Sequence, residues 1–364
     1  VQYLILQIIM IFALFISQII CTKKGKEIIV VMHIFNYLLL FKQSLMILSM
    51  NFILNTLAVF ICFSHRLDKK VSIGMDIRRN IIKFVMHLPN MSLKKLFQLQ
   101  QKIKQKEIPK YSNHLKLQIV NHSHSKSELI SSGLKTDILI LQLPGGGYEV
   151  GLCKIYRQLA EVIQKATTFD VASLDYRVAP EKFPSALNDA FEAYNFYSLM
   201  YKNIILIGDS AGGNLALALY LKLQSQMNIN MPYKMVLMSP WTDMDAEGIS
   251  YKEKMYVDHL FSVDHHLSYN KNLIFKTSYA YGDLKNPLLS PKYANFEKFC
   301  PILIQVGGDE CLLDDSTVIF NKLKNITNAK LHVFHGMFHV FQCMAPNSVE
   351  GRAAWKEISE FVCE

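Results

Sequence analysis

Residues 203–214 read NIILIGDSAGGN, and this segment is the strongest indication of the fold. An apolar run of β-type residues stops at Gly208, and the helix-like run LALALYLKL follows a few residues later. The pattern predicts a strand, a sharp turn and a helix, with Ser210 at the apex of the turn. Gly208 and Gly212 lack the Cβ atoms that would crowd so tight a turn. We therefore expect the Ser210 hydroxyl to stand above the sheet, near the N-terminal N–H groups of the following helix.

The same kind of pattern continues on both sides of this turn, from Leu115 to the C-terminal end. Apolar strand-like segments alternate there with helical ones, which is typical of a mostly parallel sheet, so the fold class is α/β. We predict strands near 115–120, 137–143, 170–174, 203–207, 234–238, 302–306 and 330–334. We predict helices near 154–166, 184–200, 211–224, 316–325 and 348–362. Residues 113–364 are assigned to one domain, and residues 243–286, which interrupt the alternation, to a cap insertion within it.

Residues 1–63 are far more apolar than the rest of the chain. Residues 1–21 and 45–63 carry no charged side chain, and each run is long enough to cross a bilayer as a helix. Residues 28–41 form a shorter, marginal third span. A secretory signal peptide is the competing interpretation of the first run. We assign residues 1–66 to a hydrophobic membrane-anchoring region with N-terminal membrane helices.

Positive charge is concentrated directly after this apolar region. Residues 64–116 hold 13 Lys and Arg against 3 Asp and Glu, whereas residues 117–364 are mildly acidic. A basic stretch beside a membrane segment favours contact with anionic lipid headgroups and argues against a nucleic-acid-binding surface. A solvated basic helix without a partner is the alternative. Apolar residues at helical spacing lead us to assign 67–112 to a basic helical juxtamembrane or cap segment.

The compartment follows less directly from the sequence. We predict a membrane-attached protein, with the endoplasmic reticulum as a candidate compartment. The distribution of Lys and Arg around three spans favours a cytosolic catalytic domain. The glycosylation sequons at Asn90, Asn121 and Asn325 favour the opposite orientation, so both stay open. The seven cysteines are widely spaced without a C-x-x-C pattern, which indicates neither a disulfide framework nor a zinc site.

A serine hydroxyl needs a base to become a nucleophile, and the base needs an orienting acid. Downstream of Ser210, the apolar run PILIQVG leads to Asp309 and Glu310, and the next predicted strand is followed by His339. Loops after the carboxyl ends of parallel strands are where such chemistry gathers. The spacing H-x2-H-x3-H that ends at His339 is superficially metal-like, but a strand gives no helical ligand face. We expect no metal and no cofactor.

Acyl transfer also needs donors for the oxyanion of the tetrahedral intermediate. The sequence PGGGY at 144–148 follows the strand-like run ILILQL, and its three glycines allow the backbone to approach a substrate closely. We predict an oxyanion hole formed by the backbone N–H groups of Gly145, Gly146 and Ala211.

From about Ile138 onward, the chain resembles the hormone-sensitive-lipase-type branch of the α/β-hydrolase esterases, which includes arylacetamide deacetylase-like enzymes. Seven motifs carry the resemblance: PGGGY at 144–148, DYRVAPEKFPSALNDA at 175–190, GDSAGGN at 208–214, SPWTD at 239–243, NPLLSP at 286–291, VGGDECLLDD at 306–315 and GMFHVFQ at 336–342. The resemblance implies an α/β-hydrolase fold, carboxylic-ester hydrolysis and a Ser-acid-His triad. It also implies a helical cap built from the N-terminal segment and the 243–286 insertion.

Two positions depart from the pattern of that branch. The oxyanion loop usually begins with His, and here it begins with Pro144, so a side chain that supports the loop is absent. The acid is also ambiguous. Aligning the motif on its LLDD end favours Glu310 over Asp309 as the triad acid and gives Asp314 a supporting role.

The sequence also suggests roles for several other side chains. Tyr148, Tyr176 and Trp241 are candidate substrate-binding residues of an acyl or alcohol pocket, with core packing as the alternative. We also expect an ion pair between Arg177 and Glu181 and a structural role for Asp209 in fixing the turn at Ser210. The list of cysteines expected to be buried or inert is Cys153, Cys300, Cys311, Cys343 and Cys363.

These features favour a membrane-anchored serine esterase, deacetylase or lipase-like enzyme. We expect its partners to be a small-molecule or lipid ester substrate and membrane lipid, and no nucleic acid; the oligomeric state is not indicated. The alternative is a non-catalytic small-molecule-binding member of the same fold, as in the plant gibberellin receptor, which lacks the catalytic histidine. The presence of His339 favours the enzyme, and Pro144 favours the alternative.

Overall fold

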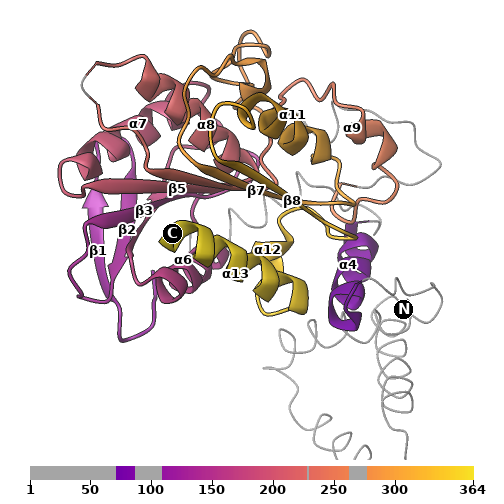
Figure 1. Ribbon diagram of the computed structural model, residues 1–364, viewed down its shortest axis with the longest axis horizontal. Helices are drawn as coiled ribbons and strands as arrows, with labels where there is room; N and C mark the ends of the chain where they lie inside the picture. Colours follow the sequence, from indigo (N-terminus) through magenta and orange to yellow (C-terminus); the bar gives the residue numbers. More distant parts are fainter. Residues whose placement is uncertain (1–70, 87–108, 228, 262–276) are drawn as a thin grey trace, which may run out of the picture. The chain divides into compact units, whose positions relative to one another are not determined.

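The computed structural model describes residues 71–86, 109–227, 229–261 and 277–364 (Figure 1). Its centre is an eight-stranded sheet in the order β1-β2-β4-β3-β5-β6-β7-β8. The strands are β1 (Lys116–Asn121), β2 (Lys126–Ser131), β3 (Ile138–Leu143), β4 (Asp170–Asp175), β5 (Asn203–Asp209), β6 (Lys234–Met238), β7 (Ile302–Gly307) and β8 (Ala329–Phe334). Strands β3 to β8 all run parallel to their neighbours among one another. At one edge of the sheet, β2 pairs antiparallel with β4, and β1 pairs antiparallel with β2.

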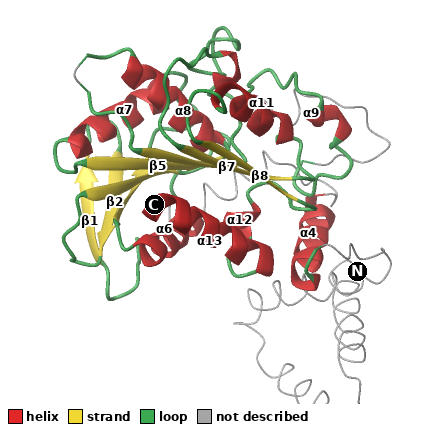
Figure 2. Cartoon of the chain, viewed as in Figure 1, coloured by secondary structure: helices red, strands yellow, loops and turns green. Residues whose placement is uncertain are grey.

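Helices cover both faces of the sheet, as Figure 2 shows. One face carries α7 (Ser185–Ser198), α8 (Ala211–Gln224) and α11 (Leu313–Leu323), and the other carries α6 (Lys154–Thr167), α12 (Phe341–Met344) and α13 (Val349–Cys363). Two short elements, α9 (Ser250–Glu253) and η1 (Pro291–Tyr293), lie in the connection between β6 and β7.

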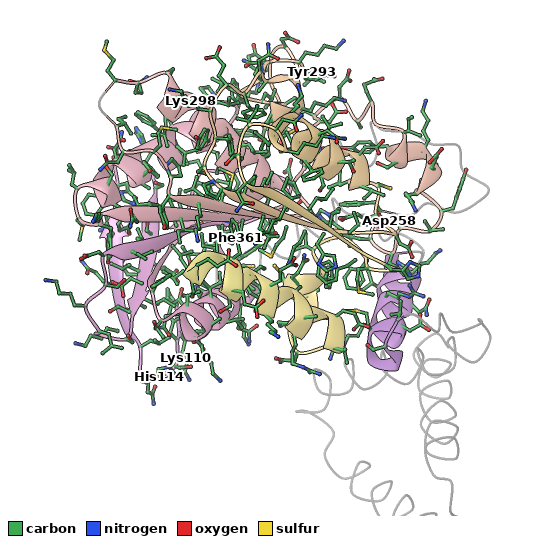
Figure 3. The ribbon with its side chains drawn as sticks, in the orientation of Figure 1. Lys110, His114, Asp258, Tyr293, Lys298 and Phe361 are labelled. Carbon is green, nitrogen blue, oxygen red and sulfur yellow. The ribbon has the colours of Figure 1, made fainter. Side chains whose placement is uncertain are left out.

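Alternation along the central strands fills two separate cores. In β5, Ile204 and Leu206 pack into the cluster beneath α7 and α8, whereas Ile205 and Ile207 pack into the cluster on the opposite face. The second cluster includes Phe361 of α13, which Figure 3 labels. Successive side chains of a strand point to opposite faces of the sheet. A strand in a sheet that helices cover on both faces is therefore apolar at nearly every position.

The seven strands and five helices expected within the domain are confirmed, with ends that differ by a few residues. Strand β2 was missed because its segment KSELIS is mostly polar. Glu128 in this strand is fully buried, and its carboxylate accepts hydrogen bonds from Arg157 at 2.8 Å and from the Tyr111 hydroxyl at 2.7 Å. A buried charge that is paired in this way breaks the apolar pattern without leaving the core.

The expectation of an Arg177–Glu181 ion pair was wrong. Arg177 instead pairs with Asp189 at 2.7 Å, and its backbone N–H donates to the same carboxylate at 2.8 Å. Asp189 lies in α7, 12 residues further along the chain, and its buried carboxylate contacts the guanidinium. The bond therefore fixes α7 against the loop that follows β4.

The N-terminal predictions are tested only in part. Helix α4 (Ile73–Met86) confirms a helix within the basic segment, and it is considered by itself because the chain divides near residue 86 into two compact units. The predicted membrane spans lie within residues 1–70, outside the described residues. In the described ranges, no helix combines the length and the apolar character that a bilayer crossing requires. Membrane attachment therefore stays a prediction.

Candidate active site

Ser210 occupies the turn between β5 and α8 that the sequence predicts. Its φ of 51° and ψ of −120° are unusual for a residue with a side chain and cost on the order of 1–3 kcal/mol. A Cβ on Gly208 would lie 2.4 Å from the Gly212 carbonyl oxygen, and one on Gly212 would lie 1.9 Å from the Leu143 carbonyl oxygen. Neither position accepts a side chain, so the two glycines allow the strained turn to exist.

His339 lies against Ser210. Its Nε2 atom is 2.9 Å from the Ser210 Oγ, and its Nδ1 atom is 2.7 Å from the Glu310 Oε2. Glu310 is fully buried, and its other carboxylate oxygen accepts the Gly307 N–H at 2.9 Å. The structure thus brings Glu310, rather than Asp309, to the imidazole. Asp309 is held through its backbone, whose N–H donates to the Met337 carbonyl at 3.0 Å.

Three loops at one edge of the sheet bring these side chains together. Strands β5, β7 and β8 run parallel, so the residues after their carboxyl ends meet although Ser210 and His339 lie 129 positions apart. The β7 and β8 loops are also in backbone contact, because a Cβ on Gly307 would lie 2.3 Å from the Met337 carbonyl oxygen. The Ser239 hydroxyl accepts the Val340 N–H at 3.2 Å and steadies the loop that carries the imidazole.

The oxyanion loop, defined as residues 144–148, follows β3 at the same edge. Gly146 and Gly147 have φ values of +118° and +63°, which glycine adopts without strain. Among the residues that the structure describes, no acceptor is found for the N–H groups of Gly146, Gly147 and Ala211. The Gly145 N–H, in contrast, donates to the Asp209 Oδ1 at 3.1 Å. The predicted donor at Gly145 is therefore already occupied, whereas those of Gly146 and Ala211 are available.

The three predicted substrate-binding aromatics are buried in the core. Tyr148, Tyr176 and Trp241 are at most 5% exposed. Their polar atoms bond within the protein: the Tyr148 hydroxyl donates to Asn214 at 2.7 Å, that of Tyr176 donates to the Pro144 carbonyl, and the Trp241 indole donates to the Asp243 carbonyl at 3.0 Å. This arrangement favours the core-packing alternative, in which they support the site from behind.

Comparison with known protein families identifies the family of this chain. Residues 140–343, which are more than half of the chain, match the family described as alpha/beta hydrolase fold. The chain belongs to the α/β-hydrolase family.

Named relatives of this α/β hydrolase are esterases. An esterase from Acinetobacter venetianus is 31% identical over 244 residues, covering 65% of this chain and 78% of that protein. An acetyl-hydrolase from Streptomyces hygroscopicus is 30% identical over 249 residues, covering 67% and 81%. A crystal structure of an esterase from the bacterial hormone-sensitive lipase family superposes with a TM-score of 0.70 at 30% identity, covering 82% of this chain and 99% of that one. These findings confirm the hormone-sensitive-lipase-type resemblance and identify the chain as a carboxylic ester hydrolase.

One aromatic contact of this α/β hydrolase was not expected from sequence. The ring of Phe261 lies 4.8 Å from the His339 imidazole, centroid to centroid. Phe261 belongs to a turn in the connection between β6 and β7, and Asp258, the buried residue labelled in Figure 3, accepts the N–H groups of Leu260 and Phe261 in this turn. Asp258 also accepts the Cys311 N–H at 2.7 Å, directly after Glu310. No motif marks this turn, and only its position in space links it to the site.

Asp209 is the ionisable group nearest to the nucleophile along the chain. Burial raises its pKa to about 6, opposed by hydrogen bonds from the Tyr156 hydroxyl and the Gly145 N–H and by the nearby His339. Burial likewise raises the pKa of Asp258, which lies beside Glu310. The expected structural role of Asp209 agrees with these contacts, since both of its carboxylate oxygens are engaged.

The remaining sequence candidates for site chemistry lie elsewhere. His332 pairs with Glu357 at 3.0 Å on the α13 side of β8. Within the described ranges, no group of His, Cys, Asp and Glu is arranged to hold a metal ion. Of the free cysteines there, Cys363 is exposed and the other four are buried, and burial raises the pKa of Cys300 to about 12.

Proposed function

We propose that this α/β hydrolase cleaves lipophilic carboxylic esters with Ser210 as nucleophile, His339 as general base and Glu310 as the orienting acid. The observation that carries the proposal is the continuous hydrogen-bonded chain from the Ser210 Oγ through both imidazole nitrogens to the Glu310 carboxylate. A buried carboxylate on Nδ1 fixes the tautomer in which Nε2 accepts the serine proton, and it stabilises the imidazolium that forms.

The reaction proceeds by two acyl transfers. The Ser210 Oγ attacks the acyl carbon, its proton passes to Nε2 of His339, and the carbonyl oxygen becomes an oxyanion. The N–H groups of Gly146 and Ala211, with Gly147 as a further donor, receive that charge. His339 then gives its proton to the leaving alkoxide, which departs as the alcohol. In the second transfer His339 deprotonates a water molecule, whose oxygen attacks the acyl carbon. The bond from that carbon to the Ser210 Oγ then breaks, His339 returns the proton to the Oγ, and the carboxylic acid leaves.

The substrate class rests on the relatives and on the N-terminal sequence. One relative is an acetyl-hydrolase, and a similar crystal structure is that of EstE5 soaked with p-nitrophenyl butyrate. Both favour short acyl groups. The apolar N-terminal region favours substrates that partition into lipid, as does the arylacetamide deacetylase-like resemblance. We therefore place the preferred substrate among short-acyl esters of lipophilic alcohols, with the enzyme attached to a membrane.

Replacement of the nucleophile tests the proposal directly. We expect Ser210→Ala to abolish hydrolysis of p-nitrophenyl acetate and p-nitrophenyl butyrate and to abolish labelling by a fluorophosphonate probe, since both reactions use the hydroxyl as nucleophile. A chain-length series of p-nitrophenyl esters should show the highest kcat/KM at short acyl groups. Hydrolysis by Ser210→Ala at the wild-type rate would refute the assignment, and a folded wild-type protein that neither hydrolyses nor labels would favour the binding-only alternative.

A further inference from the structure

We propose that Tyr156 is a positioning residue for the oxyanion loop, acting through Asp209 on Gly145. The inference rests on the proposed function, because a misplaced oxyanion loop matters only to an acyl-transfer enzyme. It assigns a role to a side chain of α6 that lies outside every motif of the esterase resemblance.

The contacts form a short relay. The Tyr156 hydroxyl donates to the Asp209 Oδ2 at 2.9 Å, and the Asp209 Oδ1 accepts the Gly145 N–H at 3.1 Å. Each carboxylate oxygen thus receives one of these bonds. Asp209 is only 2% exposed, so little water competes for these bonds, and hydrogen bonds to a charged acceptor are the strong ones.

The loop packs directly on this pair. A Cβ on Gly145 would lie 2.3 Å from the Asp209 Oδ2 and 2.9 Å from the Tyr156 hydroxyl oxygen. A side chain at position 145 would therefore collide with the Tyr156–Asp209 pair. A change in the position of either side chain therefore changes the position of Gly145 and of the free N–H groups that follow it.

The sequence of the loop explains why it needs such support. Pro144 has neither a backbone N–H nor a polar side chain, so it cannot anchor the start of the loop as a donor. Its carbonyl accepts a hydrogen bond from the Tyr176 hydroxyl. The relay through Tyr156 holds the next residue, Gly145. Two tyrosines thereby fix two successive residues, and the loop is aimed without a histidine at its first position.

The electrostatics agree with this geometry. The Tyr156 hydrogen bond lowers the pKa of Asp209 against the larger effect of burial. The titratable groups that face Asp209 are His339, Tyr156, Tyr176 and Cys343. Among these, Tyr156 donates a hydrogen bond to the carboxylate, so it favours the charged form that best accepts the Gly145 N–H.

Removal of one hydroxyl isolates the effect. We expect Tyr156→Phe to lower kcat for p-nitrophenyl butyrate about 10-fold to 100-fold with KM within about twofold, because displacing a catalytic group by about 1 Å costs on the order of 100-fold. A trifluoromethyl ketone with the same acyl chain forms a tetrahedral adduct on serine. Its affinity should fall in parallel with kcat/KM, since only the oxyanion form uses the loop donors.

Tyr201→Phe is the matched control. The Tyr201 hydroxyl donates to the Asp170 Oδ2 at 2.8 Å. This is also a tyrosine–aspartate hydrogen bond, but Asp170 is the first residue of β4, at the amino end of the strand and away from the catalytic loops. This variant should keep kcat, KM and the ketone affinity within about twofold of wild type. Equal losses of kcat in both variants would overturn the proposal. They would show that losing either tyrosine–aspartate bond lowers activity only by destabilising the folded protein.

Two further outcomes are decisive. A Tyr156→Phe protein with an unchanged Tm and more than half of the wild-type kcat would refute the positioning role, while inactive Ser210→Ala would leave the proposed function standing. If Tyr156→Phe does not fold, Asp209→Asn and Tyr176→Phe test the same loop, and both should lower kcat and ketone affinity together. Activity retained by Ser210→Ala would instead overturn the proposed function itself.

Discussion

The choice between Asp309 and Glu310 shows what a single position decides. The two acids are neighbours in one loop, and their sequence context favours Glu310 only through the alignment of the LLDD end. In space they differ completely, because Glu310 is fully buried against the imidazole while Asp309 is only partly buried. The sequence could rank the two acids, but it could not show which carboxylate turns inward.

Paired substitutions separate their roles. We expect Glu310→Gln to lower kcat by about 10³-fold to 10⁴-fold, because the amide favours the wrong imidazole tautomer and does not stabilise the imidazolium. Asp309→Asn, its matched control in the same loop, should retain activity within a few-fold of wild type. Steady-state kinetics on p-nitrophenyl acetate measure both. A larger loss in Asp309→Asn than in Glu310→Gln would reverse the assignment of the acid.

At the scale of elements, α11 is tied to the loop after β6 by a buried carboxylate. The Asp315 Oδ1 accepts the N–H groups of Thr242 at 2.5 Å and Asp243 at 2.8 Å. Asp243 in turn pairs with Lys292 at 2.6 Å. Burial, and then the neighbouring Asp243, raise the pKa of Asp315 to about 8. This raised pKa predicts that Asp315 is protonated near neutral pH in the folded protein.

This raised pKa predicts the direction of a pH effect on stability. Between about pH 4 and pH 8 the folded state holds a proton that the unfolded chain releases, so this residue lowers the free energy of unfolding as pH rises. Asp315→Asn imitates the protonated carboxyl. The Tm of Asp315→Asn minus the Tm of wild type should therefore increase from pH 5 to pH 9. The increase should be about 2–4 °C for each kcal/mol by which the free energy of unfolding of wild type falls relative to that of the variant.

Asp283→Asn is the control, since Asp283 is exposed. Thermal unfolding of the three proteins at pH 5, 7 and 9 makes the comparison. A Tm difference between Asp315→Asn and wild type that does not change with pH, or that falls as pH rises, would contradict the protonated state of Asp315.

At the scale of the whole molecule, the sequence predicted the sheet well because a doubly covered parallel sheet needs apolar strands. It missed β2, where a paired buried charge interrupts the pattern. It located Ser210 and His339 because glycines and strand ends mark such positions. It could not locate Tyr156 or Phe261, because a contact between distant elements leaves no local signal.

The predicted membrane anchor is also a property of the whole chain. Residues 1–63 are apolar enough that we expect the full-length protein to sediment with membranes and to resist extraction by alkaline carbonate. Immunoblotting of the fractions measures this, with fluorophosphonate labelling to show that the pelleted protein is active. Recovery of labelled full-length protein in the carbonate supernatant would exclude a spanning helix.

The order of the proposed catalytic residues along the chain matters during protein synthesis. Ser210 leaves the ribosome well before His339, and the imidazole reaches the hydroxyl only after β8 has joined the sheet beside β7. Domains fold as units, so the nascent polypeptide carries a hydroxyl without its proton acceptor. If the proposed mechanism holds, a chain terminated between these two residues should therefore hydrolyse no ester.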